Sequence, residues 1–287
     1  MLKGLLITLR PHQWVKNLFV LAPLVFAQEL FEGHAAIKGG IAFFIFCFLA
    51  GAVYTLNDLV DLERDRAHPL KKERPIASGR VPAAAAASMA AALTAGSLLV
   101  GAYLSTGFVI VLSVYLLVNV AYSFRLKHWP YIDVLCLAFG FLLRIVAGSQ
   151  AIGVAPSVWL LLCTFLLALF LALGKRKQEM AAVGAAAPRP VLVHYHPTVV
   201  IWGMRISAIL TLLTYAAYTL DPQTRLHFGT ALLPLGVPFA AFGIYRFLVL
   251  VNRCSTTGQS PTEAMLKDVP FVLTFVLWLG LNITLIY

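Results

Sequence analysis

The sequence is poor in charge. Only 12% of its 287 residues are Asp, Glu, Lys or Arg, whereas 60% are hydrophobic; about a quarter of the residues in an ordinary soluble domain are charged. A soluble fold is therefore not expected. The chain also lacks a soluble basic domain that could present its net charge of +10 to DNA or RNA, so no nucleic-acid partner is expected. Anchoring to anionic lipid headgroups accounts for part of that charge.

Cysteine motifs and internal repeats are also lacking, and no secretory signal is expected. The four cysteines are scattered, with neither metal-binding nor disulfide spacing, and we interpret them as packing residues: Cys47, Cys136, Cys163 and Cys254. The N-terminal apolar run is interrupted by Arg10-Pro11 too early for a secretory signal. Function must therefore be sought in the membrane-spanning part and its polar connections.

Long apolar runs alternate with short polar segments. A run of about 18 or more apolar residues can cross the hydrocarbon core of a bilayer. We therefore expect an all-α, polytopic membrane protein, and Pro11, Pro234 and Pro238 make the first and eighth spans the least regular. The sequence predicts about nine spans, near residues 15–31, 36–57, 83–103, 107–124, 132–152, 156–174, 198–220, 227–252 and 269–287.

The positive charges predict the orientation of these spans. With the N-terminus inside, 18 of the 22 Lys and Arg residues fall on the inside; Lys38 and Arg225 fall outside, and Arg144 and Arg205 lie within spans. The positive-inside rule then predicts a cytoplasmic N-terminus in the cell (inner) membrane. Nine of the 12 acids share that side, although acids obey no topology rule, so we expect a functional polar surface there.

One segment carries most of the expected chemistry: Asn57-Asp58-Leu59-Val60-Asp61-Leu62-Glu63-Arg64-Asp65, at the end of the second expected span. At about 100° per residue, Asn57, Asp58, Asp61 and Asp65 share one helix face about 100° wide. Neighbouring carboxylates repel one another unless a cation neutralises them, and oxygen ligands without His or Cys suit Mg²⁺. We therefore expect Asp58, Asp61 and Asp65 to be catalytic, metal-binding carboxylates. The alternative is an acidic helix end that merely pairs with basic neighbours, namely Arg64, Arg66 and Arg74.

At these residues the chain resembles the UbiA superfamily of intramembrane prenyltransferases. The first signature of that family is Asn-Asp-x-x-Asp-x-x-x-Asp at the end of the second helix, which Asn57, Asp58, Asp61 and Asp65 match position for position. The resemblance covers essentially the whole chain. It implies a bundle of about nine transmembrane helices around a central cavity open to the cytoplasmic side, a single transmembrane catalytic domain over residues 1–287, and Mg²⁺ as cofactor.

The chain departs from the family at the second signature. Typical members carry another aspartate-rich motif after the sixth helix, whereas this chain has Gly174-Lys175-Arg176-Lys177-Gln178-Glu179. Because cations bind anionic oxygens directly, we expect Lys175 and Arg176 to bind additional phosphate.

Further motifs are similar to the decaprenyl-phosphate phosphoribosyltransferase branch of that family. They are Arg10-Pro11-His12-Gln13-Trp14-Val15-Lys16-Asn17, Arg74-Pro75-Ile76-Ala77-Ser78-Gly79, Tyr122-Ser123 to Lys127, Asp133 through Arg144 to Gly148, and Pro261-Thr262-Glu263 with Asp268. The resemblance implies transfer of 5-phosphoribosyl from phosphoribosyl diphosphate to a polyprenyl phosphate lipid, with release of diphosphate. The substrate-binding residues that we expect are Lys16, Asn17, Asn57, Arg74, Tyr122, Lys127, Arg144, Lys175 and Arg176.

Several of these residues have a second interpretation. Lys16 could extend along apolar surface to the membrane interface, and Tyr122 could belong to the aromatic belt. Arg74 and Lys127 could serve only to set topology.

Arg144 presents a different choice, because an unpaired arginine within a membrane is costly. It lies 11 residues after Asp133, on nearly the same helix face but roughly 16 Å away along the axis. Arg144 therefore needs a substrate anion, water or a buried network. Arg205 is expected to pair with an acid such as Asp268.

Two rival functions remain open. A UbiA-type prenyltransferase would move a prenyl group from prenyl diphosphate to an aromatic or other acceptor, but it should keep the second aspartate-rich motif. A lipid or anion transporter would explain Arg144, but it gives no reason for three carboxylates on one helix face. A homo-oligomer is compatible with each of these functions.

Overall fold

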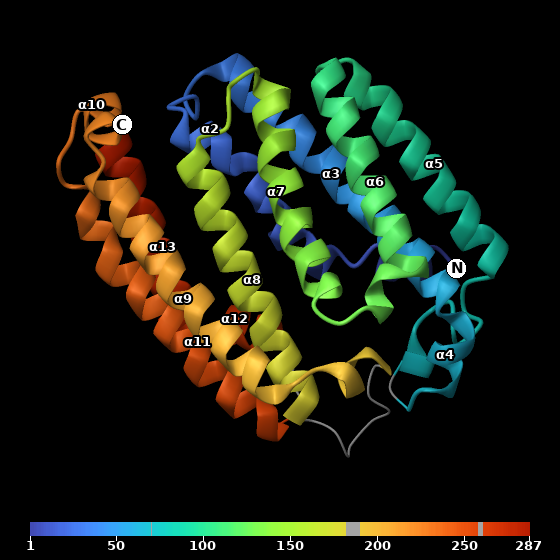
Figure 1. Cartoon of the computed structure of the whole chain (residues 1–287). Coiled ribbons are helices and arrows are strands. Elements are labelled where there is room, and N and C mark those ends of the chain that lie inside the picture. Colours follow the sequence, from blue (N-terminus) through green and yellow to red (C-terminus); the bar gives the residue numbers. More distant parts are fainter. Residues whose placement is uncertain (70, 182–189, 258–260) are drawn as a thin grey trace. The chain divides into compact units, whose positions relative to one another are not determined.

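Helices are the regular secondary structure of the part of the chain that the computed structural model describes, which is residues 1–69, 71–181, 190–257 and 261–287. Eight of its segments are long and apolar enough to cross a membrane, so the multi-pass, all-α architecture is confirmed (Figure 1). They are α3 (Gly33–Val60), α5 (Ala83–Ala102), α6 (Thr106–Phe124), α7 (Ile132–Ile152), α8 (Val158–Ala181), α9 (Pro197–Leu220), Leu233–Arg253, which includes most of α11 (Val237–Thr257), and α13 (Val269–Ile286).

The first expected span, residues 15–31, is not one long helix. Its residues form the 3-10 helix η1 (Pro11–Leu21) and the short α2 (Ala22–Phe26), so the described residues hold eight candidate spans where about nine were expected. Arg10 adopts a left-handed backbone, with φ 51° and ψ 59°, just before Pro11. Pro23 lies in the first turn of α2 and has no backbone N–H to continue a helix. These local features divide a segment whose hydropathy alone predicts a span.

Short elements precede or connect the long helices. They are α1 (Leu2–Thr8), α4 (Leu62–Ala67), η2 (Lys71–Glu73), η3 (Leu126–His128), η4 (Pro190–His194), α10 (Pro222–Phe228), η5 (Leu233–Gly236) and α12 (Pro261–Lys267). The chain forms two compact units. The first comprises residues 1–129 and 139–156, and the second comprises residues 130–138 and 157–287, so the division falls within α7.

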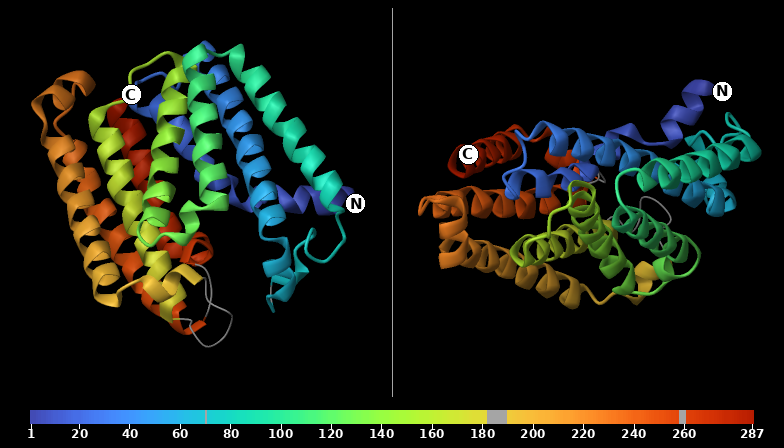
Figure 2. Two further views of the ribbon diagram at one scale, coloured as in Figure 1. Left: turned by 45° about the vertical axis from the view of Figure 1, so that its right-hand side comes forward. Right: turned by 90° about the horizontal axis from the view of Figure 1, so that it is seen from above.

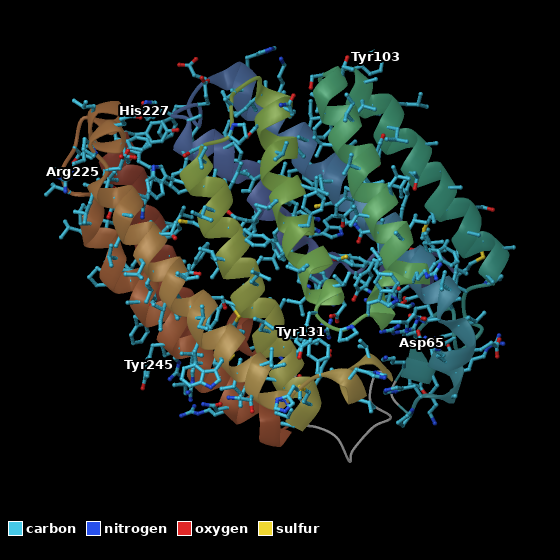
Figure 3. All side chains as sticks on the ribbon, viewed as in Figure 1. Asp65, Tyr103, Tyr131, Arg225, His227 and Tyr245 are labelled. Atoms are coloured by element: carbon cyan, nitrogen blue, oxygen red, sulfur yellow. The ribbon has the colours of Figure 1, made fainter. Side chains whose placement is uncertain are left out.

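In the first unit, α3 lies beside α5 and α6 (Figures 1 and 2). Their facing side chains, among them Phe46, Leu49 and Phe108, are fully buried. Gly148 of α7 permits a close approach to η1, because a Cβ atom there would lie 1.9 Å from the carbonyl oxygen of Val20. Asp65 and Tyr103 mark opposite ends of the unit (Figure 3).

In the second unit, α8 packs against α9 and α11 around a core that includes Phe170, Val200 and Phe247. Gly174 of α8 has a packing role, since its Cβ would lie 2.6 Å from the ring of Phe247. Arg225 lies at the end of this unit opposite to Tyr245 (Figure 3). The charged residues Asp133 and Arg176 of this unit lie near the ends of α7 and α8.

Candidate active site

The expected site residues divide between the two units. Ten of the 12 lie in the first unit, whereas Lys175 and Arg176 lie in the second. Side chains of residues 254–263 are outside the described part of the structure, and so therefore is the expected Pro261–Glu263 motif.

The acidic segment of the first unit does not form one continuous helix face. Helix α3 ends at Val60, α4 begins at Leu62, and Asp61 between them has ψ 11°, where an α-helix has about −42°. The backbone bonds from Asp61 N to Asn57 O and from Asp65 N to Asp61 O remain, at 3.0 and 2.8 Å. The chain therefore turns at Asp61, and this turn separates Asp61 from the other two carboxylates.

Asp58 and Asp65 share one arginine. Nη1 of Arg74 donates to Asp58 Oδ1 at 2.9 Å and to Asp65 Oδ2 at 2.6 Å. Arg10 also donates to Asp58 Oδ1, at 2.5 Å, and its guanidinium lies over the ring of Tyr54. Both carboxylates are buried, and burial strengthens such charge-assisted bonds. The left-handed backbone of Arg10 is a costly conformation that surrounding contacts must hold, and its bond to Asp58 is one such contact.

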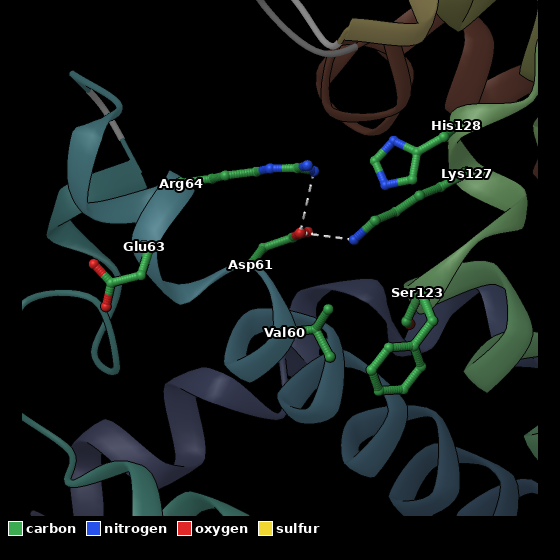
Figure 4. Close-up of a pocket in the computed structure, with 8 residues that line it drawn as sticks. Val60, Asp61, Glu63, Arg64, Ser123, Lys127 and His128 are labelled. Atoms are coloured by element: carbon green, nitrogen blue, oxygen red, sulfur yellow. Dashed lines mark hydrogen bonds and ion pairs between the residues drawn. The ribbon is translucent and has the colours of Figure 1, made fainter.

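Asp61 instead lines a pocket of about 260 Å³ (Figure 4). Its Oδ1 accepts from Lys127 Nζ at 2.7 Å and lies 3.9 Å from Arg64 Nη1. The pocket is lined by Val60, Asp61, Glu63, Arg64, Ser123, Phe124, Lys127 and His128. Among the described residues, Asp58, Asp61 and Asp65 are thus not assembled into one metal-binding group. Basic side chains neutralise these carboxylates, as expected for an acidic helix end that pairs with basic neighbours.

The donor set nevertheless fits a hard cation such as Mg²⁺, which prefers oxygen ligands. Asp58 and Asp65 place two carboxylate oxygens within hydrogen-bond distance of the same Arg74 nitrogen, so a positive charge already occupies the space between them. Asn57 Oδ1 is buried and has no hydrogen-bond partner among the described residues, although buried polar atoms are normally paired. These three residues could hold the metal, with Asp61 on the adjoining turn.

Arg144 belongs to a buried network of the first unit. Its Nε donates to Asn17 Oδ1 at 2.9 Å, Nη1 to Gly140 O at 2.8 Å and Nη2 to Tyr115 OH at 3.2 Å. The rings of Phe46, Tyr115 and Phe141 surround the guanidinium at 5.1–5.3 Å, a distance at which aromatic faces attract a cation. Asn17 is buried too; the contacts of Asn17 and Arg144 among the described residues thus match the network interpretation.

Lys16 and Tyr122 have fewer contacts. Lys16 Nζ donates to Gln13 Oε1 at 3.2 Å. The half-buried Tyr122 makes no side-chain hydrogen bond within the described part of the chain. Neither residue is therefore committed to a strong protein partner in the structure.

The second unit contains a closed ionic cluster. Arg176 Nε lies 2.8 Å from Asp133 Oδ2, as an ion pair that is not aligned as a hydrogen bond. Arg176 also pairs with Glu179, and the Tyr195 hydroxyl donates to Asp133. Burial, together with this hydrogen bond, raises the pKa of Tyr195. Arg176 was expected to bind substrate, but here its charge is committed to protein carboxylates.

Three functional candidates were missed in the sequence: Arg10, Arg64 and His128. Arg10 was visible only as part of the N-terminal motif, and its partner Asp58 lies 48 residues away. One expected pair was wrong: Asp268 pairs with Arg246 through two 2.8 Å bonds, whereas Arg205 lies over the ring of Trp202.

Comparison with known proteins identifies the family. The family model for the UbiA prenyltransferase family matches residues 19–266. The chain belongs to this family. Among its curated relatives, the decaprenyl-phosphate phosphoribosyltransferase of Corynebacterium glutamicum is 36% identical, with 99% of this chain and 87% of the relative covered. The enzyme of the same name from Mycolicibacterium smegmatis is 34% identical over 98% of this chain and 91% of its own length.

Solved structures confirm the UbiA fold. A UbiA homolog from Archaeoglobus fulgidus bound to DMAPP and Mg²⁺ superposes with a TM-score of 0.71 at 20% identity, covering 99% of each chain. A structure described as digeranylgeranylglyceryl phosphate synthase gives 0.69 at 16% identity, covering 99% of this chain and 97% of the other. At these identities the likeness establishes the fold alone.

Proposed function

We propose that this UbiA-family protein transfers a 5-phosphoribosyl group from phosphoribosyl diphosphate to a polyprenyl phosphate, as a single transmembrane catalytic domain that uses Mg²⁺. The observation that carries the proposal is the near full-length similarity to relatives named decaprenyl-phosphate phosphoribosyltransferase. The charges of the first unit support it: four cations contact three carboxylates, which leaves a positive excess suited to a substrate with several phosphates. We place the reaction at the cytoplasmic face of the cell membrane, on the distribution of Lys and Arg.

The chemistry requires little proton transfer. The bond between the anomeric carbon and the diphosphate breaks, an oxygen of the lipid phosphate bonds to that carbon, and diphosphate leaves with the electron pair. Because the lipid phosphate is already anionic near neutral pH, no general base is needed. Bound Mg²⁺ would stabilise the charge of the leaving diphosphate.

The residues of the chain would position the anions and neutralise them. Asp58 and Asp65, with Asn57, would hold the metal, and Asp61 would assist from its turn. Arg10 and Arg74 already touch these carboxylates, so they would contact a phosphate bound there. Preorganised positive groups of this kind stabilise developing negative charge at little reorganisation cost. Lys16 and Lys175 remain candidates for further phosphate contacts.

A transfer assay tests the proposal. Purified protein in detergent, given Mg²⁺, labelled phosphoribosyl diphosphate and polyprenyl phosphate, should place label in the organic phase. Asp61→Asn should lower the rate by roughly a hundredfold or more, comparable to the loss of a major transition-state contact. Its thermal midpoint should stay close to that of wild type, because Asp61 lies at the edge of a pocket rather than in the core. In membrane vesicles, added donor should react only where the cytoplasmic face is outside.

The matched control is Asp221→Asn, which makes the same chemical change in the cap of α10 in the second unit and should retain full activity. Label transferred from prenyl diphosphate to an aromatic acceptor, with none from phosphoribosyl diphosphate, would replace the proposal with the prenyltransferase alternative.

A further inference from the structure

The pocket beside Asp61 holds more positive charge than its protein groups neutralise. Lys127 and Arg64 both approach the same oxygen of Asp61. The other acid of the pocket, Glu63, points away from Asp61 in Figure 4 and pairs with Arg66 at 2.9 Å. Two permanent cations therefore share one carboxylate. A pocket with such an excess attracts anions.

Its basic groups also have unused hydrogen-bond donors. Arg64 makes no hydrogen bond with the described residues; its only contact with an acid there is the 3.9 Å approach to Asp61, and 62% of its side chain is exposed. An exposed pair at that distance contributes little, so the five N–H groups of Arg64 can turn to a ligand. The side chain of His128 likewise makes no hydrogen bond within the described chain, and its ring lies beside Lys127 in Figure 4. Ser123 adds a hydroxyl to the pocket lining.

The size and lining of the pocket favour a small phosphate group. Its volume of about 260 Å³ is lower than that of most drug-sized ligand sites. Six of its eight lining residues are polar, and Val60 and Phe124 are the two apolar members. The eight lining residues come from the ends of α3 and α6, from Asp61 between α3 and α4, from α4 and from η3. A prenyl chain would find little apolar surface there, whereas a phosphate monoester would meet Arg, Lys, His and Ser donors.

We propose that Arg64, Lys127 and His128 form a subsite for a terminal phosphate monoester, namely the 5-phosphate of the phosphoribosyl donor. This assignment rests on the proposed function. The subsite is distinct from the Asp58–Arg74–Asp65 centre, where the leaving diphosphate would bind. Asp61 stands beside both, since it belongs to the acidic segment and accepts a hydrogen bond from Lys127. The donor would thus be held by both phosphate ends, which orients its anomeric carbon.

Steady-state kinetics of Arg64→Ala and His128→Asn test the subsite. Loss of a charge-assisted contact should raise the KM for phosphoribosyl diphosphate roughly tenfold or more for Arg64→Ala, with Arg64→Glu worse and Arg64→Lys milder. The KM for polyprenyl phosphate should stay within about twofold of wild type. Arg66→Ala is the matched control, since it removes an arginine from the same helix outside the pocket and should leave both KM values unchanged.

Ribose 5-phosphate provides a second probe, because it carries the monoester and lacks the diphosphate. It should inhibit wild type competitively against the donor, and Arg64→Ala should weaken this inhibition by a similar factor. A rise in the KM for polyprenyl phosphate in place of that for the donor would overturn the assignment by giving the pocket to the lipid headgroup. Unchanged KM values and inhibition in both variants would overturn the subsite altogether.

The test separates failure of the subsite from failure of the proposed function. Wild-type protein that transfers no label from phosphoribosyl diphosphate refutes the function. In that case, stabilisation of wild type by ribose 5-phosphate in thermal unfolding, with none in Arg64→Ala, still supports a monoester subsite. Equal stabilisation of both proteins refutes it.

Discussion

The acidic segment of the first unit and the Asp133–Arg176 cluster of the second unit handle buried charge in opposite ways. In the first unit, Arg10, Arg74, Lys127 and Arg64 share three carboxylates, and several of these cations keep partial access to solvent. In the second unit, Asp133 and Arg176 are 0% and 1% exposed and are enclosed with Glu179 and Tyr195. Cations that share carboxylates and reach solvent can exchange partners with an incoming anion. The enclosed cluster has no such freedom, which suits it to hold helices α7 and α8 and the segment after η4 together within that unit.

The largest effect expected from this difference concerns the stability of the second unit. Arg176→Gln alone would leave the Asp133 carboxylate buried without a cation, and Asp133→Asn would take from the buried Arg176 one of its two carboxylate partners. Removal of one member of a buried ion pair typically costs about 3–5 kcal/mol. Thermal unfolding in detergent should show a large fall in midpoint for each variant. The double variant should lose much less than the sum of the two, because residues in contact are coupled and the buried charges of the Asp133–Arg176 pair are both removed.

The same variants decide between a structural and a substrate-binding Arg176. If Arg176 binds phosphate, Arg176→Gln should unfold at the wild-type midpoint and raise the KM for a phosphorylated substrate. We expect the reverse: a strong loss of stability and, in the folded double variant, substrate KM values within a few-fold of wild type.

A smaller effect is expected when Arg74 is changed in the first unit. Arg74→Gln would remove the cation that Asp58 and Asp65 share. In EDTA the free energy of unfolding should therefore fall by about 1.5–3 kcal/mol, the range for hydrogen bonds to charged groups. Added Mg²⁺ should restore much of it, because a metal can then take the place between the two carboxylates.

The readout is the shift in thermal midpoint between EDTA and Mg²⁺. This shift should be larger in Arg74→Gln than in wild type, and it should match wild type in Arg66→Gln, whose exposed pair with Glu63 lies outside the centre and is worth little. Equal shifts in wild type and Arg74→Gln would show that Arg74 and the metal do not compete for this space.

The sequence predicts the helices better than it predicts their irregularities. Long apolar runs predict the spans, because a segment that crosses hydrocarbon must pair its backbone N–H and C=O groups internally, as a helix does. Residues 15–31 form two short helices in place of one long one, because Arg10-Pro11 and Pro23 alter the backbone locally and hydropathy does not report such local changes. Similarly, the spacing in Asn57–Asp65 identifies the acidic site, but one backbone angle at Asp61 directs that carboxylate toward Lys127.

Partners distant in sequence are the harder part of the site. Arg10 lies 48 residues from Asp58, and Lys127 lies 66 residues from Asp61, so tertiary packing alone brings them together. The spacing of Lys175-Arg176-Lys177 predicts that these side chains diverge, because consecutive residues on a helix are about 100° apart and cannot all face one ligand. Arg176 is buried against Asp133, whereas Lys177 bonds to Asn252.

The smallest effect expected is a pH-dependent one at Asp268 of the second unit, which is more exposed than Asp133. Asp268 accepts two 2.8 Å bonds from Arg246 and also caps α13 by accepting from Phe271 N at 3.0 Å. The hydrogen bond to Arg246 is the main reason that the pKa of Asp268 is lowered. A carboxyl whose pKa is lower in the folded than in the unfolded protein adds stability above its unfolded pKa of about 3.9 and loses that contribution as the pH falls through the folded value.

Asp268→Asn removes the charge but keeps a residue that caps helices well. Its thermal midpoint should therefore lie slightly below that of wild type by a constant amount between about pH 5 and pH 8, and the gap should close in more acidic buffer. A gap that persists below the folded pKa would assign the effect to the cap, and a gap as large as that of Asp133→Asn would contradict the distinction between enclosed and accessible charge.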